Sequence, residues 1–260
     1  MRPISAASTW IRGSTRVWSR NFESWKDFAA ASLVGTLAEP LLTLFAIGFG
    51  LGRLVEPIGG QSYVAFLAPG LLASTAMTAS AFETTFGSFT RLTEQGTYEA
   101  IVRTPISVGE VVAGDILWGA SKSVLGAGFV LFLMWVLGLT ATPLAVGTLP
   151  MAFLVGLMFG AIGMAYTALA PTYAFFNYFF TLVITVMYLF SGVFFPLEGL
   201  PPWAVGAAWC LPLTHAVIVI RALAAGELQP FLLVHLGIVA AFTMLAFPLA
   251  TRLIRRRLIK

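Results

Sequence analysis

The sequence predicts an all-helical integral membrane protein with six transmembrane helices. Of its 260 residues, 58% are hydrophobic and only 10% are charged, which is more apolar surface than a soluble core of this size can bury. The apolar runs are about twenty residues or longer, the length at which a helix crosses a hydrocarbon layer of about 30 Å. The strands of a membrane β-barrel are much shorter, so the spans are helices.

Six apolar stretches are long enough to cross a bilayer. We number them spans 1 to 6, and they cover residues 28–51, 63–86, 108–137, 144–169, 173–195 and 231–254. Span 3 begins with polar residues and is expected to start outside the hydrocarbon. Residues 28–260 therefore form one six-span domain, preceded by a separate segment, residues 1–27.

The distribution of Lys and Arg predicts the orientation. With the N-terminus inside, the cytoplasmic segments hold twelve of the fifteen basic residues and the outer segments hold only Arg53 and Arg221. Cytoplasmic loops carry the excess of basic residues in membrane proteins. We therefore expect both termini in the cytoplasm, and this distribution also explains the net charge of +4 without nucleic acid as a partner.

Residues 1–27 are both basic and aromatic. The basic residues leave no apolar core of sufficient length, so no cleavable signal is expected. The mixture is typical of a helix that lies in the membrane interface, and we expect such a helix over residues 5–25, with a disordered basic tail as the alternative. The residues concerned are Trp10, Arg12, Arg16, Trp18, Arg20, Phe22, Trp25 and Lys26.

The stretch 188–221 departs from a plain row of spans. Span 5 runs into Ser191 and Gly192 and meets Pro196, and three further prolines follow. Proline lacks a donor and disfavours helix in the residue before it. The stretch nevertheless stays apolar, and irregular backbone at membrane depth persists only when it is buried in protein or lines a cavity. We expect two short half-inserted helices on the outer face, residues 202–211 and 213–225, with Trp203 and Trp209 at headgroup level.

Residues 91–105 are the longest charged connection between spans, on the cytoplasmic side of the predicted topology. Thr97 is a candidate cap for a short helix over residues 98–102, which the sequence Thr104-Pro105 would end. Such a helix would expose Glu94, Tyr98, Glu99 and Arg103 to a docking partner. A simple connector is the alternative.

Charged residues within spans are costly and often functional. Asp115 and Lys122 are seven residues apart in span 3 and so share a helix face. Glu39 lies in span 1, and Glu83 lies near the inner end of span 2. We expect a structural role for Asp115 and Glu83, whereas Lys122 is deep enough to meet an anionic or saccharide group if it faces a polar cavity.

Span 5 is rich in aromatic residues that could stack on sugar rings or contact acyl chains. The candidates for a substrate path are Lys122, Asp115, Tyr178, Phe179 and Tyr188.

Catalytic and metal chemistry find no support in the sequence. His215 and His235 are the only histidines and have no carboxylate pair beside them, which makes a poor metal site. No Gly-x-Ser-x-Gly elbow and no phosphate-binding loop is present. We expect no catalytic residue, no metal and no cofactor in this chain.

Several runs together resemble the ABC type-2 transporter permeases over nearly the whole chain, and most closely their nodulation-protein-J branch. That branch pairs with a separate ATPase to export lipo-oligosaccharides. The runs are Glu94-Gln-Gly-Thr-Tyr-Glu-Ala-Ile-Val-Arg-Thr-Pro-Ile, Gly114-Asp-Ile-Leu-Trp-Gly-Ala-Ser-Lys, Phe190-Ser-Gly-Val-Phe-Phe-Pro, Leu200-Pro-Pro-Trp and Leu211-Pro-Leu-Thr-His-Ala.

The resemblance implies a role for each non-spanning segment. Residues 5–25 become a connecting helix, residues 91–105 the coupling helix on the ATPase, and residues 196–225 the re-entrant outer helices. The coupling residues would be Glu94, Thr97, Tyr98, Glu99, Arg103, Thr104 and Pro105, and the outer gate Ser191, Gly192, Pro196, Pro202, Trp203, Pro212 and His215. ATP and Mg²⁺ would be bound by two copies of the ATPase, and two copies of this chain would form a homodimer.

The expected function is therefore the permease half of an exporter in the inner membrane of a bacterium, moving a lipo-oligosaccharide or similar glycolipid outward. An exporter of hydrophobic drugs, lipids or polysaccharide is the first alternative. A membrane-embedded enzyme that processes lipids is the second, although no convergent acid, base or metal group is visible for it.

Overall fold

The computed structural model describes residues 6–140 and 142–259, with only the backbone described for residues 6–9. Residue 5, the first of the helix expected over residues 5–25, lies outside these ranges. Within the described ranges the regular structure is helical, apart from one isolated bridge between Ile58 and Gln61. Six helical segments are long and apolar enough to cross a membrane: Ala29–Arg53, Tyr63–Thr93, Val108–Val136, Pro143–Leu169, Tyr173–Phe190 and Leu232–Leu258. The predicted all-helical, six-span class is confirmed, and the chain is a multi-pass membrane protein.

Three helices form the centre of the bundle: α3 (Tyr63–Phe82), α6 (Val108–Val136) and α7 (Thr148–Leu169). Small residues let them approach closely. A Cβ on Gly156 would lie 2.6 Å from the Ala120 Cα, and the Ser80 hydroxyl donates to the Gly156 carbonyl at 2.6 Å. Because lipid provides no hydrophobic drive for helices to associate, small residues and hydrogen bonds are what hold such a contact.

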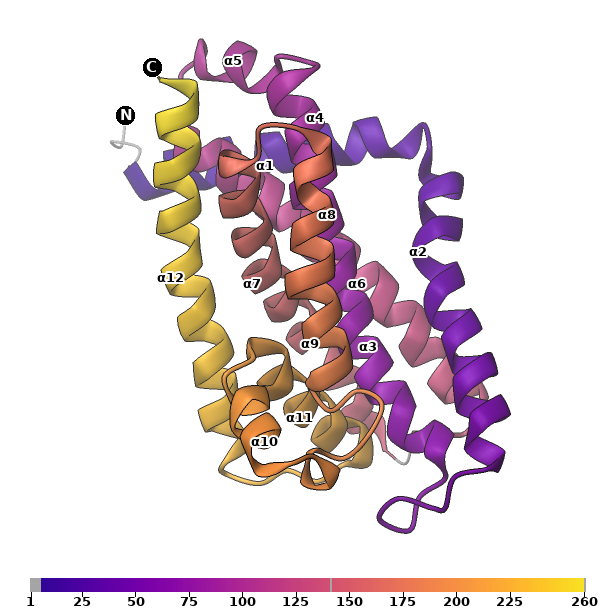
Figure 1. Cartoon of the computed structure of the whole chain (residues 1–260). Helices are drawn as coiled ribbons and strands as arrows, with labels where there is room; N and C mark the ends of the chain where they lie inside the picture. Colours follow the sequence, from indigo (N-terminus) through magenta and orange to yellow (C-terminus); the bar gives the residue numbers. More distant parts are fainter. Residues whose placement is uncertain (1–5, 141, 260) are drawn as a thin grey trace.

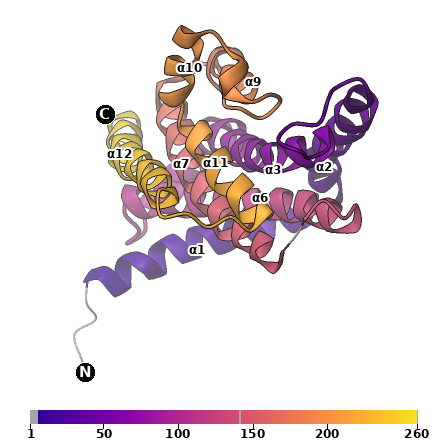
Figure 2. The same cartoon turned by 90° about the horizontal axis from the view of Figure 1, so that it is seen from below.

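Spans 1 and 5 flank this centre and are mostly exposed. Span 1 consists of α2 (Ala29–Thr43), the π-helical η1 (Leu44–Gly50) and η2 (Leu51–Arg53), and α2 stands at the edge of the bundle in Figures 1 and 2. Span 5 consists of η5 (Tyr173–Phe175), α8 (Phe176–Phe179), the π-helical η6 (Phe180–Ile184) and α9 (Thr185–Phe190). The prediction that span 5 reaches residue 195 is wrong, because Gly192 adopts φ +77° and turns the chain out of the helix.

Helix α1 (Ala6–Lys26) lies across one end of the bundle (Figure 1), so the alternative of a disordered tail is wrong for these residues. It packs against α6. The Trp18 indole donates to the Ser121 hydroxyl at 2.9 Å, and the rings of Trp18, Phe22 and Trp25 surround Trp118. The aromatic side of α1 therefore contacts protein.

Helices α10 (Pro202–Trp209) and α11 (Pro212–Ala225) meet at an angle of 85° at the end of the bundle opposite α1 (Figure 1). Helix α10 ends two residues earlier than predicted, because the residues before Pro212 leave the helix. Arg221 of α11 donates to the Gly192 carbonyl at 2.9 Å and the Phe66 carbonyl at 3.4 Å. It thus links α11 to the ends of spans 2 and 5 that lie opposite α1.

The remaining elements connect these layers. After α3, span 2 continues through the π-helical η3 (Glu83–Gly87) into α4 (Ser88–Thr93), and α5 (Thr97–Val102) follows. The 3-10 helices η4 (Pro143–Gly147) and η7 (Leu197–Gly199) precede α7 and α10. Helix α12 (Leu232–Leu258) brings the chain back to the end where α1 and α5 lie (Figure 1).

Candidate functional site

A cavity of about 450 Å³ lies between spans 1, 2 and 5. Span 1 contributes residues at spacings of three and four, which place them on one face of α2. Lys122 of span 3 reaches the same cavity. The lining residues are Ala31, Ser32, Gly35, Thr36, Glu39, Thr78, Ala79, Phe82, Lys122, Phe180, Ile184, Thr185 and Tyr188. Hydroxyls and two ionisable groups therefore share the wall with aromatic and aliphatic side chains.

Lys122 sits where the cavity meets the bundle centre. Its ammonium is 2.9 Å from Oε2 of Glu83, and its side chain is 13% exposed. An ammonium has three donors, and Glu83 takes the one hydrogen bond found for it within the described residues. Lys122 can therefore offer further donors to a group in the cavity.

Asp115 lies at the centre of a buried polar cluster and is fully buried. Its Oδ1 accepts from the Asn21 amide at 2.6 Å. Its Oδ2 accepts from the Ser88 hydroxyl at 2.8 Å, from Arg91 Nε at 3.2 Å and from the Tyr98 hydroxyl. Asp115 thus joins α6 to α1, α4 and α5, which fits the structural role expected for it. It does not line the cavity at Lys122, and its place on a substrate path stays a prediction.

Arg91 connects the two buried carboxylates. Its Nη2 lies 2.8 Å from Glu83 Oε1, and its Nε lies 3.2 Å from Asp115 Oδ2. Two carboxylates thus face two cations, because Lys122 pairs with the second oxygen of Glu83. We call Glu83, Arg91, Asp115 and Lys122, together with the Tyr98 hydroxyl, the charge network.

The sequence reasoning missed Arg91 and Asn21 as members of this site. Arg91 was assigned to the cytoplasmic connection because span 2 was expected to end at residue 86. The helix instead continues through η3 and α4 to Thr93, and the spacing of eight residues between Glu83 and Arg91, about two turns, is the signal that could have paired them.

The segment 91–105 forms a short helix, as expected, but in a different orientation. Gly96, at φ +59°, precedes α5, so Thr97 is its first residue rather than its cap. Tyr98 was expected to be exposed and is fully buried, because its ring packs inside the bundle and its hydroxyl meets Asp115. Burial, and secondly the Asp115 charge, raise the pKa of Tyr98 well above its usual range, so it remains a hydrogen-bond donor. The exposed residues of the segment include Glu94, Glu99, Arg103, Thr104 and Pro105.

The predicted aromatic path residues are divided by the structure. Tyr188 lines the cavity. Phe179 is 1% exposed and belongs to the core, and Tyr178 is exposed but does not line the cavity. Tyr178 and Phe179 therefore do not line this cavity, and their place on a substrate path stays a prediction.

The predicted outer gate residues lie in two environments. Ser191, Gly192, Pro212 and His215 are buried, Pro196 is half-buried, and Pro202 and Trp203 are exposed. These seven residues lie near the junction of span 5 with α10 and α11.

His215 contacts His235 of α12, with 2.8 Å between the two Nδ1 atoms. The Trp209 carbonyl, 3.1 Å from His215 Nε2, can only accept. Neutral His215 therefore carries its proton on Nε2 and accepts from His235 Nδ1. Within the described residues no group of three or more His, Cys, Asp and Glu side chains could hold a metal ion.

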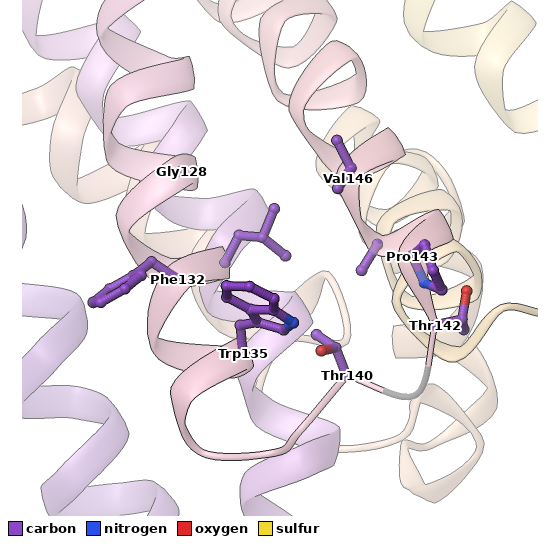
Figure 3. A pocket seen from close by; sticks show the side chains of 9 residues that line it. Gly128, Phe132, Trp135, Thr140, Thr142, Pro143 and Val146 are labelled. Atoms are coloured by element: carbon purple, nitrogen blue, oxygen red, sulfur yellow. The ribbon is translucent and has the colours of Figure 1, made fainter.

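A second cavity, of about 530 Å³, lies between the end of α6 and η4 (Figure 3). Figure 3 shows Phe132 and Trp135 on one side and Pro143 and Val146 on the other. No ionisable side chain is among its lining residues in the described part of the chain. This cavity is suited to apolar groups, whereas the cavity at Lys122 combines polar and apolar surfaces.

Comparison with known proteins gives consistent matches over most of the chain. A family model described as ABC-2 type transporter matches residues 15–224. The protein named Nodulation protein J from Rhizobium meliloti (strain 1021) is 41% identical over 242 residues, which cover 93% of this chain and 92% of the relative. Its namesake from Rhizobium leguminosarum bv. trifolii is 42% identical over 244 residues, covering 94% and 93%. The Inner membrane transport permease YadH of Escherichia coli (strain K12) is 25% identical over 231 residues, covering 86% and 88%.

Proposed function

The chain belongs to the ABC-2 type transporter family, and from this premise we propose that it is the permease subunit of an ATP-driven exporter in a bacterial inner membrane. The proposed cargo is amphipathic, with a sugar-bearing head and a lipid chain, as in a lipo-oligosaccharide. The observation that carries this choice is the mixed lining of the cavity between spans 1, 2 and 5.

Each part of the cavity wall suits one part of such a cargo. Lys122 and the hydroxyls of Thr36, Thr78 and Thr185 can hydrogen-bond sugar oxygens. Phe82 and Phe180 offer ring faces and apolar contact to an acyl chain. Binding sites of this kind are mostly apolar, with a few polar groups that fix orientation.

The proposed partner is a separate ATP-binding subunit, two copies of which bind ATP and Mg²⁺. The docking surface is proposed to comprise the exposed residues Glu94, Glu99, Arg103, Thr104 and Pro105 of the 91–105 segment, together with the half-buried Thr97. Their charges stand at the end of the bundle that also holds α1 and the basic end of α12 (Figure 1). By the excess of basic residues, this end is proposed to be cytoplasmic.

Two copies of the permease are proposed to face each other across spans 1 and 5, which have large exposed apolar surfaces and border the cavity. Closing of the ATPase subunits on ATP would push on α5 and separate these spans toward the outside. The change requires ATP to bind the closed state more tightly than the open one. The helices α10 and α11 are proposed to be re-entrant and to close the outer end.

Reconstitution with the ATPase subunit tests the proposal. A short acylated oligosaccharide is expected to stimulate ATP hydrolysis, and Lys122→Ala is expected to weaken that response, because it removes the cation of the cavity wall. Lys26→Ala, on the exposed face of α1, is the matched control and should respond as wild type. Stimulation by hydrophobic drugs with acylated sugars inert would contradict the cargo while leaving an exporter.

A further inference from the structure

We propose that the charge network transmits cargo binding at Lys122 to α5, the helix proposed to contact the ATPase. The inference rests on the proposed cargo site, and it adds a route from that site to the docking surface. It also gives roles to Tyr98 and Arg91 that do not involve contact with either cargo or ATPase.

The first argument is the continuity of the contacts. Lys122 Nζ reaches Glu83 Oε2 at 2.9 Å, and Glu83 Oε1 meets Arg91 Nη2 at 2.8 Å. Arg91 Nε meets Asp115 Oδ2 at 3.2 Å, and the same oxygen accepts the Tyr98 hydroxyl. An unbroken series of charged hydrogen bonds therefore runs from the cavity wall to the buried side of α5.

The second argument is that each end of the network has a different environment. At one end, Lys122 lines the cavity and has donors to spare. At the other end, Tyr98 is fully buried while Glu94 and Glu99, on the same segment, are exposed. One end can therefore sense a ligand, and the other holds the docking segment against the bundle.

The third argument concerns competition for Lys122. A cargo oxygen that draws the ammonium toward the cavity lengthens its bond to Glu83. The negative charge of Glu83 is then balanced mainly by Arg91. Arg91 also pairs with Asp115, so the two carboxylates compete for the same cation. In a low-dielectric interior such changes are weakly screened, so the strength of the bond between Asp115 and Tyr98 changes as well.

The network also contains an element with room to rearrange. Glu83 begins the π-helical turn η3, a geometry that is frequent at functional sites. Gly87 ends this turn, and a Cβ there would lie 2.7 Å from Glu83 Oε1. Only glycine leaves the Glu83 carboxylate its present position, so Gly87→Ala displaces Glu83 without removing any charge.

A double-mutant cycle between the two ends tests the inference. The variants are Tyr98→Phe, which keeps the ring and removes only the hydroxyl, Lys122→Met, and the two combined. Tyr166→Phe is the matched control, because its hydroxyl donates to the Phe175 carbonyl at 3.1 Å, outside the network. Each permease is reconstituted with the ATPase, and the ratio of ATP hydrolysis with and without a short acylated oligosaccharide is measured, together with binding of that oligosaccharide to the permease.

We expect Tyr98→Phe to bind the oligosaccharide as wild type does and to lose stimulation by about fivefold or more, the lower end of typical coupling between sites. Lys122→Met should lose both binding and stimulation, and the double variant should lose no more stimulation than the more affected single variant. Gly87→Ala should reproduce the loss seen for Tyr98→Phe, and it provides the test if that variant fails to assemble. Tyr166→Phe should be unaffected.

Two results would overturn the inference alone: normal stimulation in both Tyr98→Phe and Gly87→Ala, or losses in the double variant that multiply. Fold-losses that multiply correspond to coupling free energies that add, which would mean that the two ends act independently. A wild-type protein that neither binds the oligosaccharide nor responds to it would instead remove the proposed cargo, and the inference with it.

Discussion

The central helices α3, α6 and α7 and the flanking spans 1 and 5 are all apolar, but they are held by different means. In span 2, 89% of the apolar stretch is buried inside the protein, against 11% in span 1 and 17% in span 5. Glycines and interhelical hydroxyl bonds fix the centre, whereas spans 1 and 5 meet it mainly around a cavity. We call the closely packed centre the frame and spans 1 and 5 the flanks.

The π-helical turns do not follow this division, because one of them lies in span 2 of the centre. Spans 1, 2 and 5 each contain one, at Leu44–Gly50, Glu83–Gly87 and Phe180–Ile184, and these are the spans that surround the cavity. Within the described residues α6, α7 and α12 contain none. Such turns interrupt the regular i→i−4 hydrogen bonds, recur at functional sites and are places where helices kink. Spans 1, 2 and 5 are therefore the spans in which we expect bending.

The largest effect should come from filling the centre. Gly156→Leu places side-chain atoms where the Ala120 backbone stands, because even a Cβ would be 2.6 Å away, and overpacking by less than this already costs about 1–3 kcal/mol. We expect little folded protein, measured by yield and thermal unfolding in detergent. Gly35→Leu in span 1 is the matched control, since nothing lies within 4 Å of its Cβ. Equal yields of the two variants would refute the division into frame and flanks.

The next largest effect should follow from removing one carboxylate from the buried ion pairs of the frame. Asp115→Asn keeps the shape but leaves Arg91 and Lys122 opposite Glu83 alone. Removing one partner of a buried ion pair typically costs about 3–5 kcal/mol, which denaturant unfolding of the purified protein can measure. Glu39→Gln, an exposed carboxylate on the cavity wall, should change stability by less than about 0.5 kcal/mol. A comparable loss in both variants would show that burial does not distinguish them.

A smaller effect is expected where the frame meets span 5. Arg221→Met removes the bond to the Gly192 carbonyl, and hydrogen bonds of charged groups contribute about 1.5–3 kcal/mol. The loss should be local, so hydrogen exchange should increase for residues 188–197 while α7 stays protected. Arg53→Met is the control, because Arg53 is exposed at the end of span 1. Unchanged exchange at residues 188–197 would show that Arg221 does not hold this junction.

The sequence predicted the frame better than the site, for physical reasons. Hydropathy and helix length placed six spans to within a few residues, because the bilayer thickness sets both. Span 2 was ended too early because Glu83, Thr84 and Thr85 interrupt its apolar run, although all three are buried in protein. A polar residue near the end of a span can be buried in the helix bundle or exposed to solvent, and a single sequence does not distinguish the two.

Tyr98 shows the same limit at smaller scale. A six-residue helix has too few turns for its apolar face to be read from periodicity. The partners of Asp115 also come from three other helices, α1, α4 and α5, and Asn21 of α1 lies 94 residues away from it in the sequence. The sequence singles out Lys122 because a cation within a span is conspicuous by itself. It also contains Glu83, but the pairing of Glu83 with Lys122 follows only from the packing of span 2 against α6.

The smallest expected effect concerns the outward side of α5, which distinguishes a segment anchored to the frame from one that only connects spans. If Tyr98 holds α5 in place, Glu99 must face away from the bundle, where it is exposed. Glu99→Lys should then weaken assembly with the ATPase subunit by about 0.2–1 kcal/mol, the range for an exposed ion pair. Because such pairs are screened by salt, the difference from wild type should diminish as ionic strength rises, which titration of the ATPase at low and high salt can measure. Glu56→Lys makes the same charge change in the exposed connection between spans 1 and 2 and should leave assembly unchanged. Equal weakening by both substitutions would indicate an effect of net charge, and the assignment of α5 as the docking surface would then be wrong.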